Sequence, residues 1–391
     1  MKTSVLFING HLNTGGVEKS LVDILHHMDF DRYEVDLLLL EGLGDYAPEL
    51  PPEVHVRLVD LHNTYGSLPK ALLRCLCERD WLCLRMRWLL WLARGGNSRH
   101  LRRARALLFG NRHYDVVIGF RPGICTDIAA FAADADHRIT WWHHGAYNLS
   151  GAAEQAYRLD CVKMDQVVSV SNSCAVFLGQ HIPETQEKTV IIPNLLSAET
   201  IQKKAVLNSP TEKPMDTGLL VSVGRLSPEK HFENVVYTAV YLLEHGIHNF
   251  HWYVVGDGVE RTRLEALAEN SGVQEYVRFI GNQLNPYPIL RQADLFVHPS
   301  YVESQGIVVL EAMALSVPCV VTRSLGPCEF IEDGVNGILT EQNPQSLSEK
   351  VRDMLTDRAL YDKIKANTRC PMQFSPEQVM AQIEELLERK R

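Results

Sequence analysis

The chain has 391 residues, of which 46% are hydrophobic and 22% are charged, and its formal net charge is −9. This length predicts two or three domains, and the composition is that of a folded globular protein, not of a disordered or collagen-like chain. An acidic chain is a poor candidate for a general nucleic-acid binder, so we expect no nucleic-acid partner.

The cysteines and the apolar runs bear on the cellular compartment. The nine cysteines are odd in number and contain no Cys-x-x-Cys pair, which argues against a disulfide framework or a structural zinc site. The apolar run Val5–Ile8 is too short for the core of a signal peptide. No apolar stretch approaches the roughly 20 residues that span a bilayer. We therefore expect a cytoplasmic protein.

Short apolar runs alternate with helical patterns along the whole chain. In the first half the runs are Ser4–Ile8, Val35–Leu40, Val54–Leu58, Val116–Ile118, Ile139–Trp142 and Val167–Val170. In the second half they are Leu219–Val223, Trp252–Val255, Val277–Ile280, Leu295–Val297 and Cys319–Val321. Such near-continuous runs are typical of parallel strands that are buried on both faces. The pattern predicts an α/β protein with two doubly wound domains.

Composition also suggests where the domains end. Pro193-Asn194 closes the first half, and the polar segment 197–217, with two prolines, has the composition of a linker. We expect an N-terminal domain over 1–196 and a C-terminal domain over 218–375. Residues 376–391 form a charged helical pattern beyond the second domain.

Segment 66–112 differs in charge from the rest of the chain. It holds eleven Lys or Arg and two Asp or Glu, a net charge of +9, which leaves −18 on the remainder. If the segment is helical, one stripe contains Cys77, Trp81, Leu84, Trp88 and Trp91. A basic helix with such a face, flanked here by Arg85 and Arg87, suits an anionic membrane surface. The alternative is that the stripe packs against its own domain and the arginines are solvated.

The strongest local motif runs from Val223 to His231, with the sequence Val-Gly-Arg-Leu-Ser-Pro-Glu-Lys-His. It follows an apolar run, so it lies where a parallel strand leads into a helix, the place where α/β domains bind ligands. Arg225 and Lys230 can direct two cations at one anionic group, aided by backbone N–H groups at the helix start. The alternative is a surface turn with solvated charges.

A second motif has Glu303 and Glu311 with seven residues between them, one of which is Gly306. Glu303 is expected on a loop after a strand, and Glu311 on the first turns of the next helix. Carboxylates there can accept hydrogen bonds from sugar or ribose hydroxyls. The alternative is a solvated helix residue and a helix-capping neighbour, but the nearby Arg225/Lys230 loop favours a binding site.

Five motifs occur in the order found in one enzyme family. They are Gly224-Arg-Leu-x-x-Glu-Lys230, Val255-Gly-Asp-Gly258, Phe279-Ile-Gly281, Glu303-x7-Glu311 and Glu332-Asp-Gly-Val-Asn-Gly337. In this combination the chain resembles the retaining glycosyltransferases of family 4. The resemblance implies the GT-B fold, in which two Rossmann-like domains face each other across a cleft. It also implies transfer of a sugar from a nucleotide sugar to a glycan acceptor.

The resemblance assigns roles to particular residues. Arg225 and Lys230 match the pair that holds the donor diphosphate and stabilises the leaving group, while Glu303 matches the residue beside the transferred sugar. His144 matches a histidine that lines the donor-sugar pocket; it is preferred to the adjacent His143 because it directly precedes Gly145. The further donor-binding positions implied are Gly15, Gly16, Gly256, Gln305, Gly306, Ile307, Val308 and the ribose-binding Glu311.

The resemblance also implies the co-substrate, the acceptor and the location. We expect no tightly bound cofactor and no metal, because Arg and Lys replace the metal in this family, and a UDP- or GDP-linked sugar as donor. The acceptor is expected to be a glycan or lipid-linked glycan of a cell-surface polysaccharide or glycolipid, met on the inner face of the membrane. The family often has Glu-Gly-Phe where this chain has Glu303-Ser304-Gln305, so the donor sugar stays open.

Three alternatives to this hypothesis were weighed. Asp134-Ala-Asp136 has the spacing of a divalent-metal site, but it is expected in a polar turn before a strand, far from the donor motifs. A GT-B relative with phosphorylase or epimerase chemistry is a second alternative. The third is a catalytically silent partner of another transferase, which would not need to retain Arg225, Lys230, Glu303 and Glu311 together.

Overall fold

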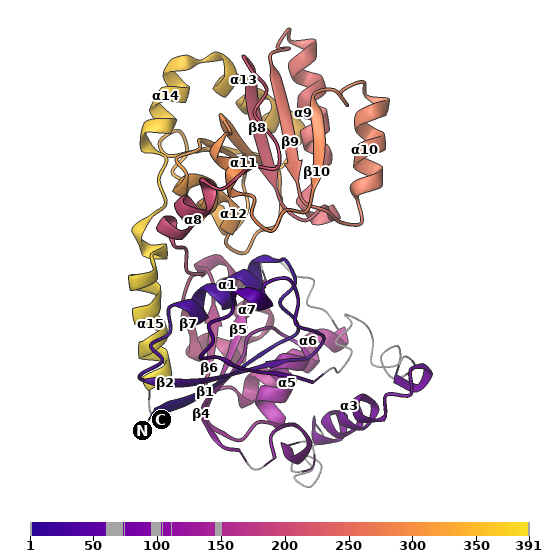
Figure 1. Ribbon diagram of the computed structural model, residues 1–391, viewed down its shortest axis with the longest axis vertical. Coiled ribbons are helices and arrows are strands. Elements are labelled where there is room, and N and C mark those ends of the chain that lie inside the picture. Colours follow the sequence, from indigo (N-terminus) through magenta and orange to yellow (C-terminus); the bar gives the residue numbers. More distant parts are fainter. Residues whose placement is uncertain are drawn as a thin grey trace. The chain divides into compact units, whose positions relative to one another are not determined.

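The computed structural model describes residues 2–59, 73, 75–94, 103, 105–110, 112–144 and 151–389. The side chains of residues 87, 90, 91, 93, 94, 152 and 153 lie outside this description. The chain forms two compact units (Figure 1). Unit 1 comprises Met1–Leu195 and Pro376–Arg391, and unit 2 comprises Leu196–Ser375.

Unit 1 is built on a parallel sheet whose described strands have the order β3-β2-β1-β4-β5-β6-β7. The strands are β1 (Thr3–Asn9), β2 (Tyr33–Leu39), β3 (His55–Leu58), β4 (Tyr114–Gly119), β5 (Ala135–Trp142), β6 (Gln166–Ser169) and β7 (Thr189–Ile191). The helices are α1 (Gly16–His26), α3 (Trp81–Arg94), α5 (Ile124–Phe131), α6 (Gly151–Lys163), α7 (Asn172–His181) and α15 (Pro376–Glu388).

Alternation of side chains along β1 explains its continuous apolar sequence. Val5 and Phe7 belong to a buried cluster with α1 and α15, whereas Leu6 and Ile8 belong to a second cluster with α3 and α5. Because helices cover both faces of the sheet, every residue in the middle of the strand is buried. The expectation of parallel strands buried on both faces is confirmed for β1. It is wrong for the predicted run Val54–Leu58, because the edge strand β3 is exposed at every residue.

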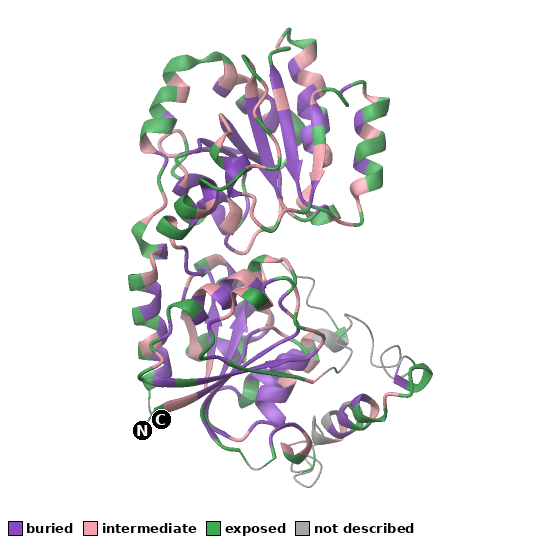
Figure 2. Ribbon diagram, in the orientation of Figure 1, coloured by how far each residue is buried: buried purple, intermediate pink, exposed green. Residues whose placement is uncertain are grey.

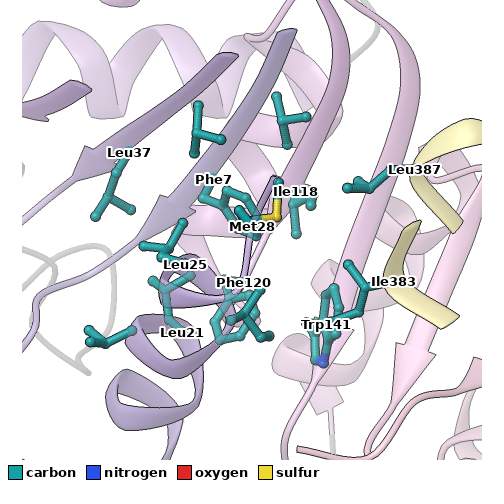
Figure 3. Close-up of a cluster of buried hydrophobic side chains, with 14 of the residues drawn as sticks. Phe7, Leu21, Leu25, Met28, Leu37, Ile118, Phe120, Trp141, Ile383 and Leu387 are labelled. Atoms are coloured by element: carbon teal, nitrogen blue, oxygen red, sulfur yellow. The ribbon is translucent and has the colours of Figure 1, made fainter. Parts of the chain in front are cut away.

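Helix α15 completes the first of these clusters although it comes from the far end of the chain. Ile383 and Leu387 are buried in the same cluster as Trp141 and Phe7, as Figure 3 shows. At the sheet edge, Arg32 donates a hydrogen bond to Glu384 at 2.6 Å. The final helix is therefore part of the core of unit 1.

Helix α3 lies within the basic segment 66–112 and has two distinct faces. Cys83, Met86 and Leu89 are buried in a cluster of unit 1. Trp81 and Trp88, in contrast, are 65% and 56% exposed. Figure 2 shows that buried and exposed residues alternate along this helix. The face that packs into the domain is thus offset from the tryptophan stripe. Of that predicted stripe, the Trp91 side chain lies outside the described residues.

Unit 2 has a second parallel sheet, with the strand order β10-β9-β8-β11-β12-β13 in the described chain. The strands are β8 (Gly218–Val223), β9 (Phe250–Val255), β10 (Val277–Gly281), β11 (Leu295–His298), β12 (Cys319–Thr322) and β13 (Ile338–Thr340). The helices are α8 (Ala198–Ala205), α9 (Glu233–Glu244), α10 (Arg261–Asn270), α11 (Tyr287–Arg291), α12 (Ile307–Ala314), α13 (Pro344–Thr356) and α14 (Arg358–Asn367).

The helices of unit 2 are divided between the two faces of its sheet. α8, α11 and α12 contribute to one buried cluster, and α9, α10, α13 and α14 contribute to the other. Both units are therefore three-layered α/β structures. No helix in the described part of either unit is both long enough and apolar enough to cross a membrane.

The segment 197–217, expected to be a linker, contains helix α8. Ser197 caps this helix by accepting a hydrogen bond from the backbone N–H of Thr200 at 3.2 Å. Ile201 and Ala205 are buried in the core of unit 2. Glu199, Gln202 and Lys203 lie on the exposed face of this amphipathic helix, while both prolines and most of the other polar residues of the segment follow it, which is why composition alone pointed to a linker.

Candidate functional site

The charged residues predicted in the second half gather at the topological switch point of unit 2. Strands β8 and β11 are neighbours in the sheet, and the strand order runs in opposite directions on either side of them. The loop after β8 leads through a short 3-10 turn, η3 (Pro228–Lys230), and the loop after β11 carries Glu303. Open α/β sheets bind ligands in the crevice at the carboxyl ends of such strands.

Lys230 and Glu303 meet directly at this point. Lys230 Nζ donates to Glu303 Oε1 at 2.6 Å, and His298 Nε2 lies 2.7 Å from the same oxygen. His298, at the end of β11, is almost fully buried. A hydrogen bond to a carboxylate requires a donor, so Nε2 carries the proton. The sequence analysis did not include His298; its place beside the predicted loop was the available signal.

The environment of Glu303 keeps this carboxyl ionised. Burial by itself would raise its pKa, but the charge of Lys230 and the charge and hydrogen bond of His298 outweigh that effect. The pKa of Glu303 is therefore held well below its ordinary value. An ionised carboxylate accepts hydrogen bonds strongly, as binding of sugar hydroxyls requires.

Arg225 is exposed on the loop after β8, which is held against the loop after β9. The backbone N–H of Leu226 donates to the carbonyl of Asp257 at 2.9 Å. Gly256 has φ 142, and a Cβ there would collide with the carbonyl oxygen of Gly224. Only glycine permits this close packing of the two loops. In this structure Gly256 therefore supports the loop that carries Arg225.

The second part of the Glu-x7-Glu motif is buried. Glu311 is 4% exposed on α12, and Tyr287 donates a hydrogen bond to its Oε1 at 2.9 Å. The alternative that Glu311 is a solvated helix residue is therefore wrong. Gln305 is also buried, and Gly306 is the N-cap of α12. Ile307 and Val308 are the first residues of that helix, where backbone N–H groups lack partners within the helix.

Unit 1 has a corresponding charged cluster at its own switch point, between β1 and β4. Arg121 follows β4 and pairs with the buried Glu18 of α1 at 2.9 Å. His11 follows β1 and lies 3.7 Å from both Glu18 and Glu41. The sequence analysis missed this cluster, because its members belong to separate parts of the chain. The signal was a charged or imidazole side chain after each of the two strands.

The predicted glycine loop of unit 1 lies next to this cluster. Gly16 begins α1 and Gly15 is its N-cap. A Cβ on Gly15 would collide with Glu18 Oε2. Gly15 thus lets the backbone lie close to the charged cluster, as a loop that approaches a ligand requires.

The two adjacent histidines have different surroundings. His143 is 6% exposed, and its ring centroid lies 4.7 Å from that of Phe120. Burial holds the pKa of His143 well below its ordinary value, so this ring is neutral. His144 is partly exposed and lies against Trp142. His144 is therefore the more accessible of the two histidines. Gly145, which was the reason for preferring His144 in the sequence, lies outside the described residues.

The Asp134-Ala-Asp136 pattern lies at the amino end of a strand, opposite the edge where the other site residues gather. Asp134 precedes β5 and pairs with Arg105 at 2.9 Å, while Asp136 lies inside β5. His113 bridges the two carboxylates at 3.5 and 3.3 Å. Within the described ranges, no group of three or more His, Cys, Asp or Glu residues is arranged to hold a metal ion.

Comparison with known proteins agrees with this architecture. The crystal structure of Anabaena Alr3699/HepE in complex with UDP matches with a TM-score of 0.70 at 18% identity, covering 99% of both chains. A crystal structure of WaaG, a glycosyltransferase involved in lipopolysaccharide biosynthesis, matches with a TM-score of 0.67 at 19% identity over 98% of both chains. The predicted α/β architecture, two Rossmann-like domains of the GT-B fold, is confirmed.

Sequence comparison shows the family. The model of "Glycosyl transferases group 1" matches residues 204–370. Lipopolysaccharide glucosyltransferase WaaG of Escherichia coli (strain K12) is 33% identical over 270 residues, covering 65% of this chain and 72% of that protein. The lipopolysaccharide core biosynthesis glycosyltransferase LpsE of Rhizobium meliloti is 32% identical over 161 residues, covering 41% of this chain and 46% of that protein.

The chain therefore belongs to the glycosyl transferases group 1 family. Its homologues include glycosyltransferases of lipopolysaccharide biosynthesis. The matched region spans about half the length of the first curated relatives, and 72% of WaaG.

Proposed function

We propose that this chain is a retaining, metal-independent glycosyltransferase that transfers a hexose from a nucleotide sugar to a glycan acceptor. The observation that carries the proposal is the pairing of Lys230 with the nearly buried, ionised Glu303 at the switch point of unit 2. A cation for a diphosphate and a carboxylate for sugar hydroxyls thus lie side by side, with the exposed Arg225 on the same loop as Lys230.

In the proposed reaction, the acceptor hydroxyl attacks the anomeric carbon on the face from which the diphosphate leaves. The anomeric C–O bond breaks, and its electron pair goes to the diphosphate oxygen. The proton of the acceptor hydroxyl passes to an oxygen of the same diphosphate. Arg225 and Lys230 stabilise the negative charge that develops there. Glu303 orients the transferred sugar and Glu311 binds the ribose, so neither carboxylate acts as a nucleophile.

Further donor contacts are assigned by the same proposal. Backbone groups from Gln305 to Val308, at the start of α12, meet the donor phosphates or sugar. His144, the more accessible of the two histidines, meets the donor sugar, and Gly15 and Gly16 let the backbone approach the phosphates.

We propose a UDP-linked sugar as the donor. Support comes from the HepE structure, which contains UDP, and from the related HepE structure in complex with UDP-glucose. GDP-linked donors are the alternative. The Glu303-Ser304-Gln305 sequence, in place of Glu-Gly-Phe, leaves the identity of the sugar to experiment.

Calorimetric titration with UDP and with GDP, each with and without EDTA, tests this proposal. We expect binding of UDP that EDTA does not change, because fixed cations hold the diphosphate. Arg225→Ala combined with Lys230→Ala is expected to abolish both binding and turnover, and Arg278→Ala, on β10, serves as a matched charge control. Binding that depends on a divalent ion would contradict metal independence. Absence of binding to either nucleotide would favour the silent-partner alternative.

We further propose that the acceptor is a lipid-linked glycan of a cell-surface polysaccharide, met at the inner face of the membrane. The relatives of lipopolysaccharide biosynthesis support this class of acceptor. The exposed Trp81 and Trp88 of α3 support membrane contact, as does the net charge of +9 on segment 66–112. A basic segment with exposed aromatic side chains suits anionic lipid headgroups.

Sedimentation with lipid vesicles tests the membrane contact. We expect binding to vesicles of phosphatidylcholine and phosphatidylglycerol, and weaker binding to phosphatidylcholine alone. Trp81→Ser with Trp88→Ser should lower the affinity about 10-fold or more, because two large apolar surfaces no longer enter the lipid. Tyr237→Ser, which removes an exposed aromatic side chain from α9 of unit 2, is the control. Unchanged binding of the double variant would refute the proposal.

A further inference from the structure

His231 has a backbone conformation that is unusual for a residue with a side chain. Its φ is 49° and its ψ is 43°, in the left-handed region that glycine occupies most readily. It directly follows Lys230 and ends the 3-10 turn η3. Strained residues of this kind persist where the surrounding structure holds them, and they concentrate at functional sites.

The surroundings of His231 show what holds it. Its imidazole is stacked on the ring of Tyr301, with centroids 3.8 Å apart and planes 25° apart. Its Nδ1 lies 3.1 Å from Glu233 Oε1, and Glu233 is in turn paired with Arg263 at 3.2 Å. The left-handed turn therefore directs the His231 ring onto the loop that follows β11.

Tyr301 is itself fixed at both ends. The buried Asn234 donates to its hydroxyl at 3.2 Å, and Gln342 donates to its backbone carbonyl at 3.1 Å. Tyr301 lies two residues before Glu303, just as His231 lies one residue after Lys230. The stack thus joins the two loops immediately beside the Lys230–Glu303 ion pair.

We propose that the His231–Tyr301 stack is a positioning device that sets the spacing between Lys230 and Glu303. In terms of the proposed function, on which this inference rests, it fixes the distance between the cation for the donor diphosphate and the carboxylate for the transferred sugar. The ion pair alone cannot do this in the presence of donor, because a diphosphate competes with Glu303 for Lys230. The stack has no such competitor, so the spacing is retained when donor binds.

The variants follow from the geometry. His231→Gly removes the ring and suits the left-handed backbone, and His231→Asn removes the ring while keeping a residue that tolerates this conformation. Tyr301→Leu removes the stack from the other side, whereas Tyr301→Phe keeps the ring and loses only the hydroxyl. The matched control is Tyr241→Leu, because Tyr241 and His245 at the end of α9 form a stack of similar geometry, with centroids 3.9 Å apart.

The first measurement is an NMR titration of the Glu303 carboxyl in the full-length protein labelled with ¹³C-glutamate, assigned with Glu303→Gln. In the wild type, Tyr241→Leu and Tyr301→Phe, the signal should stay that of a carboxylate throughout the acid range in which the protein is folded. In His231→Gly, His231→Asn and Tyr301→Leu, the pKa of Glu303 should rise. Equal titration in all variants would overturn the inference, whatever the enzyme's substrate proves to be.

The second measurement separates binding from turnover, with UDP and UDP-glucose as probes. We expect the ring-removing variants to keep the melting temperature of the wild type. Their affinity for UDP should stay within about twofold of the wild-type value. Their rate of UDP release from UDP-glucose should fall about 10- to 100-fold, the usual consequence of a misplaced reacting group. A fall in melting temperature without a selective loss of turnover would show a purely structural role. Lack of UDP binding by the wild type would instead count against the proposed function.

Discussion

At the residue scale, the candidate site depends on one carboxylate whose charge is maintained by its neighbours. Glu303 is nearly buried, and an isolated buried carboxylate takes up a proton to avoid the cost of desolvation. Lys230 and His298 both bind its Oε1, at 2.6 and 2.7 Å, and so stabilise the ionised form. His298 has no place in the predicted motif, yet it is as close to Glu303 as Lys230 is.

This arrangement predicts a specific dependence of stability on pH. Since the pKa of Glu303 in the folded state is below its ordinary value of 4.5, its contribution is complete above pH of about 5 and is lost as pH falls toward the folded-state pKa. Glu303→Gln should therefore be less stable than the wild type by about 1–3 kcal/mol at pH 7. The difference should shrink by up to about 1.4 kcal/mol per pH unit below pH of about 4.5.

Urea unfolding at several values between neutral pH and pH of about 3 measures this difference. Glu275→Gln, at an exposed position, is the control and should show little difference from the wild type at any pH. A constant gap between the wild type and Glu303→Gln down to pH of about 3 would show that the ion pair does not maintain the charge of Glu303.

At the element scale, α15 and α3 show how an amphipathic helix divides its roles between faces. α15 buries Val379, Ile383 and Leu387 in unit 1, so its apolar face is used for folding. α3 buries Cys83, Met86 and Leu89 in the same way but keeps two tryptophans exposed on its other side. Exposed large aromatic residues that are not needed for the core are the feature on which the proposed membrane contact of α3 rests.

The role of α15 in the core of unit 1 leads to a stability prediction. Ile383 is fully buried, so Ile383→Ala should destabilise the protein by about 2–5 kcal/mol through lost burial and a residual cavity. Gln382→Ala, one residue earlier on the exposed face, should change stability by less than about 0.5 kcal/mol. The midpoint of urea unfolding, with unit 1 followed by the fluorescence of Trp141 and Trp142, is the measurement. Equal midpoints for the two variants would exclude a core role for α15.

At the scale of the whole molecule, the two units repeat one architecture with different side chains at the same place. Each has a charged cluster where the strand order reverses, between β1 and β4 in unit 1 and between β8 and β11 in unit 2. In unit 1 the carboxylate is the buried Glu18, paired with Arg121, and in unit 2 it is the nearly buried Glu303, paired with Lys230. Unit 2 adds the exposed Arg225 on the same loop, which gives it the surplus of positive charge that a diphosphate needs.

This difference predicts where a nucleotide stabilises the molecule. UDP should slow amide hydrogen exchange in residues 224–231 and 301–311 of unit 2, and leave β1 and β2 in the core of unit 1 unchanged. At a concentration about 100 times its Kd, UDP should add about 2.7 kcal/mol to the stability of the unit that binds it. Hydrogen exchange followed by mass spectrometry gives the map. Protection confined to unit 1 would show that the nucleotide binds to unit 1 and would contradict this prediction.

Much of this fold could be predicted from the periodicity of apolar residues in the sequence. Every predicted apolar run overlaps a strand, from β1 to β6 and from β8 to β12, because most of these strands are buried on both faces and leave a continuous apolar signature. The three-residue edge strands β7 and β13 were missed, since so short a run has no distinct pattern. Helix α8 was missed because its polar outer face dominates the composition of its segment.

The candidate site could be predicted only in part from the sequence. The motifs containing Lys230 and Glu303 were found because each is a local pattern next to an apolar run. His298, Tyr301 and the Glu18–Arg121 pair were not found, because no local pattern states that these side chains meet. The same limit applies to Glu311. The sequence allowed it to be a solvated helix residue, and only its burial and its hydrogen bond from Tyr287 exclude this.

The sequence by itself determined the class of fold and predicted the residues that we propose to bind an anionic nucleotide sugar, since strand periodicity and motif order are local properties of the chain. Only the tertiary structure decided which charges are paired, which face of α3 stays exposed, and that His231 stacks on Tyr301. These outcomes depend on distances between residues far apart in the chain. Burial then decides how strongly those residues interact, because a charge removed from water is stable only beside its partner.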